Sequence, residues 1–326
     1  MAVYAAGSWR NGMSVEGPGS VEFLVAGDLF VDLVMSGFLS WPPGAGEEIF
    51  AERFCREIGG GAAITACGLA RLGAKVGVVG VIGKTDGQWL VEKLQAAGAD
   101  ISAIRQTSGE PTAITVSVSS AMDRTFLTYM GANRELPAWL RQWSSGSEFV
   151  KGRHVHLACA PDPAEAAKLF QELKAPGGTL SVDAGWHPQW LADARCKVAL
   201  RDADVFLPNE REAALMTGES EPRQILEAFQ KMGVATVALK LGTRGAALLS
   251  DEKITFCAPL KVESVDSTGA GDCFDAGFLF AWLRGGDPHK CLKAGTICGA
   301  LSTRSLGGIA GFPTPSELHA QLEAGA

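Results

Sequence analysis

Short apolar runs alternate with helical patterns along most of the chain, and this alternation constrains the fold more than any other feature. The apolar runs are short enough to be buried strands, and most are separated by segments whose apolar residues recur every three to four positions. We therefore predict a parallel sheet with helices on both faces. The predicted strands are 23–26, 76–81, 154–158, 179–182, 205–207, 236–239 and 246–249, and the predicted helices are 62–72, 88–97, 164–173, 210–216 and 224–232.

Two regions interrupt this alternation, at about 31–54 and 112–131. In the second region Ile114, Val116 and Val118 alternate with small polar residues, which is the period of a half-buried strand. We expect both regions to form antiparallel strands outside the main sheet. Residues 1–20 are rich in Gly, Ser and Asn without apolar periodicity, which predicts a disordered tail or extension before a domain that covers 21–326.

Composition excludes several classes of protein. The 326 residues, 47% hydrophobic and 20% charged, suit a soluble globular enzyme, and no apolar run approaches the length of a membrane span. A net charge of −7 argues against nucleic acid or an anionic membrane as a partner. The eight cysteines occur singly, which indicates neither a zinc site nor a disulfide framework. We expect a cytoplasmic protein with reduced thiols.

The segment 266–272, Asp-Ser-Thr-Gly-Ala-Gly-Asp, leads directly into an apolar helical pattern. Glycines in a tight turn at a helix N-terminus let backbone N–H groups hold a phosphate or a developing oxyanion. Asp272, in the first turn of the helix, would stand beside that site and could take a proton from a hydroxyl that attacks a phosphoryl group. An isolated Asp at a helix start is explained by the helix dipole alone, but the preceding Gly-Ala-Gly favours a catalytic role.

A second glycine-rich segment and an acidic residue lie near the N-terminus. Gly59, Gly60 and Gly61 precede small residues, so a ligand could approach the backbone closely there, although a flexible turn before an Ala-rich helix has the same pattern. Asp32 follows the first predicted strand in Gly-Asp-Leu-Phe-Val-Asp. A carboxylate that accepts two O–H bonds suits a diol, and a solvated strand-end acid is the alternative.

Two further segments follow predicted strands in the second half of the chain. Asn209 and Glu212 have the spacing of a helix N-cap and its capping-box partner, and carboxylate oxygens also suit Mg²⁺ with retained waters. Residues 240–245, Lys-Leu-Gly-Thr-Arg-Gly, are either a simple turn between strands or a glycine loop that a ligand can approach.

Three other sequence patterns do not fit the motifs that they partly match. Residues 83–85 match the end of a P-loop, but its first glycine would fall on Val78. The spacing of Gly77, Gly80 and Gly83 is only loosely that of a dinucleotide loop and lacks its acidic partner. His154 and His156 share one face of a strand, and we expect core or edge histidines rather than metal ligands.

Taken together, these segments resemble the motifs of the ribokinase-like, or PfkB, carbohydrate kinases, and they occur in family order from Asp32 to Asp272. The resemblance implies a ribokinase-like three-layer α/β/α sandwich with a mostly parallel central sheet. It also implies a small β-sheet lid over the sugar site, with lid strands within about 31–54 and 112–131, and a homodimer formed through that lid.

The resemblance further implies a role for each motif residue. Asp272 would be the catalytic base, with Gly269, Ala270 and Gly271 forming the anion hole. Asp32, Gly60, Gly61 and Ile64 would contact the acceptor. The cofactors would be ATP, Mg²⁺ and a monovalent cation such as K⁺. ATP would lie against Asn209, Glu212, Lys240, Gly242 and Gly245, Mg²⁺ would bind Glu212 through water, and Asp266 and Thr268 would border the monovalent cation.

Two departures from the family pattern bear on the substrate. Ile64 stands where the family has an Asn, and residues 183–187, Asp-Ala-Gly-Trp-His, lack the Asn and Arg of the family Asp-Xaa-Asn-Xaa-Arg. We expect ATP-dependent phosphorylation of a primary hydroxyl of a sugar or sugar derivative. A nucleoside kinase is the alternative, with Trp186, Phe38 or His187 beside a base and Asp32 on the ribose diol. A catalytically silent metabolite-binding protein is a third hypothesis.

Overall fold

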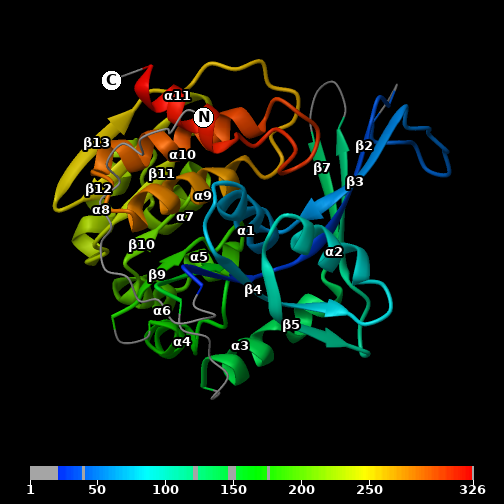
Figure 1. Cartoon of the computed structure of the whole chain (residues 1–326), viewed down its shortest axis with the longest axis horizontal. Coiled ribbons are helices and arrows are strands. Elements are labelled where there is room, and N and C mark those ends of the chain that lie inside the picture. The colour runs from blue at the N-terminus through cyan, green and yellow to red at the C-terminus, as the bar shows by residue number, and fades with distance from the viewer. Residues whose placement is uncertain (1–20, 39–40, 120–123, 146–151, 175–176, 325–326) are drawn as a thin grey trace, which may run out of the picture.

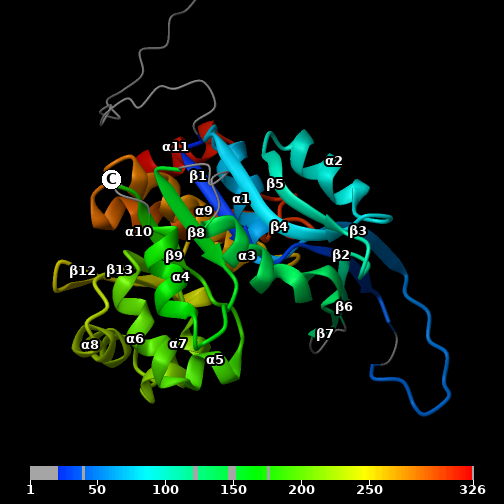
Figure 2. The same ribbon diagram turned by 90° about the horizontal axis from the view of Figure 1, so that it is seen from below.

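A large sheet between two layers of helices forms the centre of the protein (Figures 1 and 2). The structure is a computed structural model that describes residues 21–38, 41–119, 124–145, 152–174 and 177–324, so the predicted tail 1–20 lies outside the described residues. Within these ranges the sheet has nine strands in the order β13-β12-β11-β10-β9-β8-β1-β4-β5. Only the β11–β12 and β12–β13 pairs are antiparallel, which confirms the predicted mostly parallel α/β sandwich.

The strands of this sheet, in chain order, are β1 Phe23–Gly27, β4 Val76–Gly83, β5 Asp100–Thr107, β8 His154–Ala158, β9 Thr179–Val182, β10 Val205–Phe206, β11 Val237–Lys240, β12 Ala246–Ser250 and β13 Lys253–Cys257. One face carries α1 Gly61–Arg71, α2 Gln88–Ala96, α9 Ala270–Leu283, α10 Pro288–Ser302 and α11 Pro315–Glu323. The other carries α3 Leu136–Ser145, α4 Ala166–Leu173, α5 Pro188–Ala192, α6 Ala194–Ala199, α7 Glu210–Thr217 and α8 Pro222–Met232. Short 3₁₀ turns are η1 Gly131–Glu135, η2 Leu200–Asp202 and η3 Gly242–Arg244.

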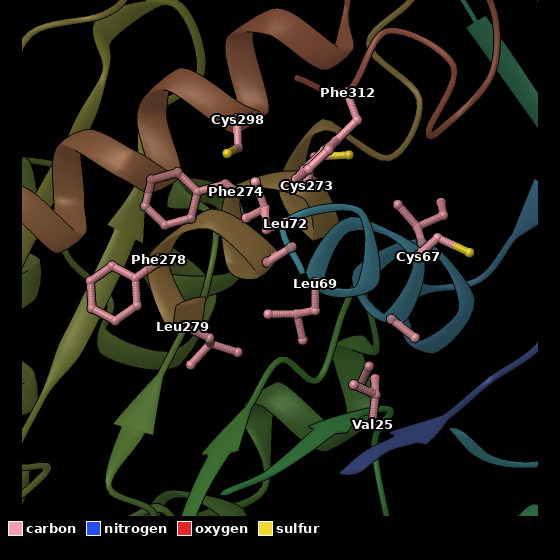
Figure 3. Packing of buried hydrophobic residues seen from close by; sticks show 14 of the residues in the cluster. Val25, Cys67, Leu69, Leu72, Cys273, Phe274, Phe278, Leu279, Cys298 and Phe312 are labelled. Carbon is pink, nitrogen blue, oxygen red and sulfur yellow. The ribbon is translucent and has the colours of Figure 1, made fainter. Parts of the chain in front are cut away.

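The two faces of the sheet have separate hydrophobic cores because successive residues of a strand point to opposite sides. Phe23 and Val25 of β1 belong to the core beneath α1 and α9, whereas Leu24 and Ala26 belong to the core on the other face. Figure 3 shows side chains of α1 and α9 in the first core. A Cβ added to Gly68 of α1 would lie 2.8 Å from the Cβ of Ala276, so a small residue there lets α9, which begins with Ala270, lie close to α1.

A second sheet lies to one side of the first (Figures 1 and 2). Its order is β3-β2-β6-β7, and its strands are β2 Phe30–Ser36, β3 Arg53–Gly59, β6 Ala113–Ser119 and β7 Arg124–Tyr129. These strands pair apart from the main sheet, as the alternating pattern predicted. The expected all-antiparallel pairing was wrong for one pair, because β2 and β6 are parallel. The chain returns to β6 through α1, β4, α2 and β5, and so long a crossover permits parallel pairing.

His154 and His156 are core residues of β8, as the sequence predicted. The two ring nitrogens of His154 bond the hydroxyls of Thr179 and Ser181 at 2.8 and 2.7 Å, and Nδ1 of His156 bonds Ser181 at 2.8 Å. Burial lowers the pKa of His154 to about 3 and the pKa of His156 to about 4. Both imidazoles are therefore neutral in the folded protein near neutral pH.

Replacing His156 with Gln should change how stability depends on pH. The unfolded imidazole takes up a proton below about pH 6.5, and the buried one does so only near 4, so His156 destabilises the fold as the pH falls. Relative to wild type, the variant should gain about 1.4 kcal/mol of unfolding free energy per pH unit between pH 6 and 4.5. Urea titrations of both proteins at several pH values give the difference between their unfolding free energies. The contributions of carboxyl groups are the same in both proteins and cancel in this difference. His319→Gln, on exposed α11, is the control, and an identical pH dependence of the His156 variant and wild type would contradict the argument.

None of the described helices is long and apolar enough to cross a membrane. All eight cysteines are free thiols.

Candidate active site

One cavity lies where the second sheet meets the N-terminal ends of α1 and α9. It has a volume of about 680 Å³. Residues of β2, the glycine segment before α1 and the glycine turn before α9 all contribute to its walls, although they are far apart in the sequence. Its lining residues are Phe30, Asp32, Gly60, Ile64, Thr115, Phe126, Ser267, Thr268, Gly269 and Asp272. The structure therefore brings the predicted acceptor residues Asp32, Gly60 and Ile64 together with Gly269 and Asp272.

The glycine turn before α9 is held in a shape that only glycine permits at its cap. Gly269 is the N-cap with φ +69°, and a Cβ there would lie 2.9 Å from both Gly308 Cα and Ile64 Cδ1. The helix starts at Ala270, whose N–H donates to Ser267 O at 3.3 Å. The N–H of Gly271, in the first turn, has no partner within the helix and can receive an anion.

The carboxylate of Asp266 holds this turn through hydrogen bonds. Its Oδ1 accepts hydrogen bonds from Thr268 N at 2.9 Å and Thr268 Oγ1 at 2.8 Å, and its Oδ2 accepts one from Gly307 N at 2.9 Å. The side chain is buried. Asp266 and Thr268 thus lie side by side, and the hydrogen bonds of Asp266 tie the turn to the loop at Gly307.

Asp272 lies in the first turn of α9, where its carboxylate faces the start of α1. A Cβ on Gly61 would be 3.2 Å from Asp272 Oδ1, so Gly61 also borders the site although it does not line the cavity. Burial, with the added repulsion of Asp183, raises the pKa of Asp272 to about 7, and Lys240 opposes this rise. A carboxyl group with a pKa near neutrality is suited to accept a proton at that pH.

Asp32 lies on the opposite wall, on β2. A Cβ on Gly59 would lie 2.0 Å from Asp32 Oδ1, so glycine at 59 leaves room for this carboxylate. Burial raises the pKa of Asp32 to about 7, and the charges of Asp266 and of Glu57, its partner on β3, add to the rise. The carboxylate can accept hydrogen bonds from acceptor hydroxyls in the cavity.

Lys240 is more deeply buried than its expected place in a loop over ATP suggested. Its Nζ lies 2.7 Å from Asp183 Oδ2 and 3.1 and 3.2 Å from the two oxygens of Asp275. One carboxylate oxygen from each of Asp183, Asp272 and Asp275 lies within 4.8 Å of the others. A Cβ on Gly271 would be 3.5 Å from Nζ, so the ammonium group lies directly beside the glycine turn.

This charged network contains two residues that sequence reasoning did not assign to the site. Asp275 follows Asp272 by three residues, which places both on one side of α9. Asp183 directly follows β9, whose carboxyl end meets the same edge of the sheet as β11. Helical spacing and strand ends were therefore signals that could have identified both.

Asn209 and Glu212 form the predicted capping box at the start of α7. Asn209 N donates to Glu212 Oε2 at 2.9 Å, and Glu212 N donates to Asn209 Oδ1 at 2.9 Å. Burial and the repulsion of Asp183 raise the pKa of Glu212 to about 7. Asn209 pairs with Lys240 in an isolated bridge, so the capping box lies next to the charged network.

Gly242 and Gly245 lie in the turn after β11, outside the cavity. Both have positive φ, +57° and +89°, and a Cβ on Gly245 would lie 2.1 Å from Cys257 O. Gly242 has open space around it, so a ligand can approach its backbone. Arg244, between them, forms an ion pair with Glu210 at the start of α7.

The three candidates for stacking a base do not line this cavity. The ring of Trp186 lies 3.8 Å from the guanidinium of Arg211, the ring of Phe38 lies 5.7 Å from that of Trp41, and His187 lines a separate, smaller cavity. Phe30 and Phe126 form the aromatic wall instead. Phe30 could have been found from its place two residues before Asp32 on the same strand face, whereas Phe126 depends on how β7 pairs.

Comparisons with known proteins agree with this geometry. Residues 27–315 match the sequence model of the pfkB family carbohydrate kinases. The chain is 29% identical over 286 residues to 2-dehydro-3-deoxygluconokinase of Bacillus subtilis, covering 83% of this chain and 88% of that protein. It is 31% identical over 272 residues to the ATP-dependent ribose-1-phosphate kinase of Halopiger xanaduensis, covering 81% and 86%.

Solved structures show the same fold. Arabidopsis thaliana ribokinase complexed with ribose and ATP has a TM-score of 0.78 and 24% identity, covering 94% of this chain and 99% of that one. Escherichia coli ribokinase II in complex with ATP and Mg²⁺ has a TM-score of 0.77 and 23% identity, covering 93% and 99%.

Proposed function

This chain belongs to the pfkB family of carbohydrate kinases and is a sugar kinase of that family, and we propose that it transfers the γ-phosphoryl group of ATP to a primary hydroxyl of its acceptor. The observation that carries the proposal is the single cavity with Asp32 on one wall and Asp272 and the glycine turn on the other. An acceptor held by Asp32 can reach both the base and the anion site.

In the proposed mechanism the chain supplies a base, an anion site and an anchor for the acceptor. Asp32 accepts hydrogen bonds from two acceptor hydroxyls and so orients the molecule. As the attacking oxygen bonds to the γ-phosphorus and the bond to the ADP oxygen breaks, Asp272 takes the hydroxyl proton. N–H groups of residues 269–271 stabilise the charge on the transferring group.

The oxygen ligands beside the glycine turn fit Mg²⁺. This ion prefers carboxylates and retained waters, and the carboxylates of Asp183, Asp272, Asp275 and Glu212 lie at this edge of the sheet. We assign Glu212 as a water-mediated partner, with Asn209, Lys240, Gly242 and Gly245 on the side of ATP. When bound, Mg²⁺ neutralises phosphate charge. We also propose a K⁺ site bordered by Asp266 and Thr268.

Glu212→Gln should raise the Mg²⁺ concentration for half-maximal activity about tenfold, in the range for loss of an outer-shell partner. Gln keeps an oxygen that can accept the capping hydrogen bond from Asn209 N, whereas the charge and the 2.6 Å hydrogen bond from Asn209 Nδ2 to Oε1 are lost. Titrating Mg²⁺ at fixed ATP measures the effect, and EDTA should abolish activity in both proteins. Glu317→Gln, at the capping box of α11, is the matched control. An unchanged Mg²⁺ requirement in Glu212→Gln would remove this residue from the metal site.

We propose that the second sheet is a lid within one kinase domain, and that two copies pair through it. Asp32 lies on one face of this sheet. The other face exposes Phe54, Leu127 and Tyr129, which supports an apolar contact between copies. The free thiols support a cytoplasmic location.

ADP release from Mg-ATP across hexoses, pentoses, sugar acids, sugar phosphates and nucleosides, with and without K⁺, tests the proposal. Acceptor-dependent release supports it. Release with nucleosides alone would favour the nucleoside kinase, for which Phe30 and Phe126 supply an aromatic wall. No release with any acceptor would contradict the assigned activity and leave the silent metabolite-binding hypothesis.

A further inference from the structure

The acceptor cavity combines acidic, hydroxyl and apolar side chains. Its acids are Asp32 and Asp272, its hydroxyls come from Thr115, Ser267 and Thr268, and the described residues that line it include no Lys, Arg or His. From this lining we infer that the acceptor is an uncharged polyol with one apolar face, and not a sugar acid or a sugar phosphate. The inference rests on the proposed kinase function and names the class of its substrate.

Negative charge surrounds the end of the cavity where Asp32 binds hydroxyls. Glu57 lies opposite Asp32 on β3, and Asp266 lies behind the glycine turn. Both repel a negative charge at Asp32. A carboxylate or phosphate on the acceptor would enter the same field with no basic side chain among the described residues that line the cavity, and like charges in a desolvated site disfavour binding.

The basic residues near the site contact other groups. The guanidinium of Arg56, which pairs with Leu33 beside Asp32, lies 4.1 Å from the ring of Trp89, and Nζ of Lys93 lies 5.6 Å from the same ring. Lys240 is bonded to Asp183 and Asp275. On the second sheet, Arg53 pairs with Ser36, which is four residues along β2 from Asp32, or about 13 Å at the rise of a strand.

The rest of the wall offers apolar contact. Ile64 is 2% exposed and packs against Gly269 and Gly308, so this position presents no hydrogen-bond donor or acceptor to the acceptor molecule. Phe30 and Phe126 line the same cavity. The region of the acceptor molecule that faces these side chains should carry no hydroxyl group, as in a deoxy position or a planar ring. A buried hydroxyl without a hydrogen-bond partner is costly. The two curated relatives, in contrast, are named for a sugar acid and a sugar phosphate.

Matched acceptor pairs test the inference. Ribose against ribose 1-phosphate, fructose against fructose 6-phosphate, and sorbitol against gluconate differ mainly in charge, and nucleosides extend the neutral set. The kcat/KM for the best neutral acceptor should exceed that for every charged acceptor at least 100-fold. A charged acceptor that is preferred would overturn the inference while leaving the kinase function intact. No ADP with any acceptor would overturn the kinase function, and the inference with it.

A charge placed in the cavity provides the second test. Thr115 lies beside Asp32 on β6, so Thr115→Lys introduces an ammonium group, whereas Thr115→Met changes size without charge. Both lose the contact with Thr128 Oγ1, which makes them a matched pair. The Lys variant should raise the ratio of charged to neutral kcat/KM at least tenfold over the Met variant. Phe126→Lys against Phe126→Met repeats the test at a side chain that is 53% exposed. Equal ratios in both pairs would contradict the inference.

Discussion

Replacing Asp272 with Asn is expected to lower kcat by about 10² to 10⁴, the range for loss of a general base. Asn keeps the size of the side chain in the first turn of α9 but cannot take the hydroxyl proton. ATP binding should be largely unchanged, because Asn209, Glu212 and the turn after β11 are untouched. Initial rates at saturating Mg-ATP and acceptor measure kcat, and equilibrium titration with ATP checks binding.

The pH dependence of the same reaction gives an independent reading. Asp272 must be ionised to accept a proton, and its pKa is raised to about 7, so kcat/KM of the wild type should rise with pH through about 7. Asp32 titrates in the same range, so the acidic limb belongs to the pair. The matched control is Asp287→Asn, because Asp287 caps α10 and Asn caps equally well. A kcat of Asp272→Asn equal to that of the control would remove Asp272 from the mechanism.

Lys240→Met should destabilise the protein by about 3 to 5 kcal/mol, the cost of removing one partner from a buried ion pair. Asp183 and Asp275 would lose their shared ammonium group, and Asp275 is fully buried. Urea unfolding measures the change. Lys174→Met is the control, because Lys174 is 37% exposed where it pairs with Asp204, and loss of a surface pair costs about 0 to 1 kcal/mol.

The Lys240 variant should also shift the pH profile. The ammonium group lowers the pKa of Asp272, so its removal should move the acidic limb of kcat/KM to higher pH. Asp183→Asn should move the limb to lower pH, because Asp183 raises that pKa. Shifts of opposite sign are not expected from simple loss of stability. Equal stability losses in the Lys240 and Lys174 variants, with no shift of the limb, would contradict the network.

The sequence predicted the parts of the fold that depend on local pattern. Strand and helix periodicity located most of the central sheet, but α10 was missed because it is buried on most of its sides and its apolar residues do not mark a single face. The parallel pairing of β2 with β6 was also missed. That pairing is set by the path of the intervening chain and not by the residues of either strand.

In the candidate site, too, residues within local motifs could be predicted and contacts between distant segments could not. Asp32 was identified from its place after the first predicted strand and Asp272 from the Gly-Ala-Gly motif before it, and the structure brings both to one cavity. Lys240 was assigned from its loop, yet its Nζ turns inward to Asp183 and Asp275, which lie 57 and 35 residues away in the sequence. Trp186 was a candidate for its aromatic ring, whereas Phe126 reaches the cavity only through the pairing of β6 with β7. Contacts between distant segments leave no local pattern to detect.

The most direct test of the account is ³¹P NMR of the reaction mixture with Mg-ATP and the best neutral acceptor from the matched pairs. The account predicts that ADP and one phosphomonoester appear in equal amounts, with the ester phosphorus coupled to the two protons of a CH₂ group, and that Asp272→Asn slows both together. ADP formed without a new ester, or an ester on a secondary carbon, would contradict the transfer to a primary hydroxyl.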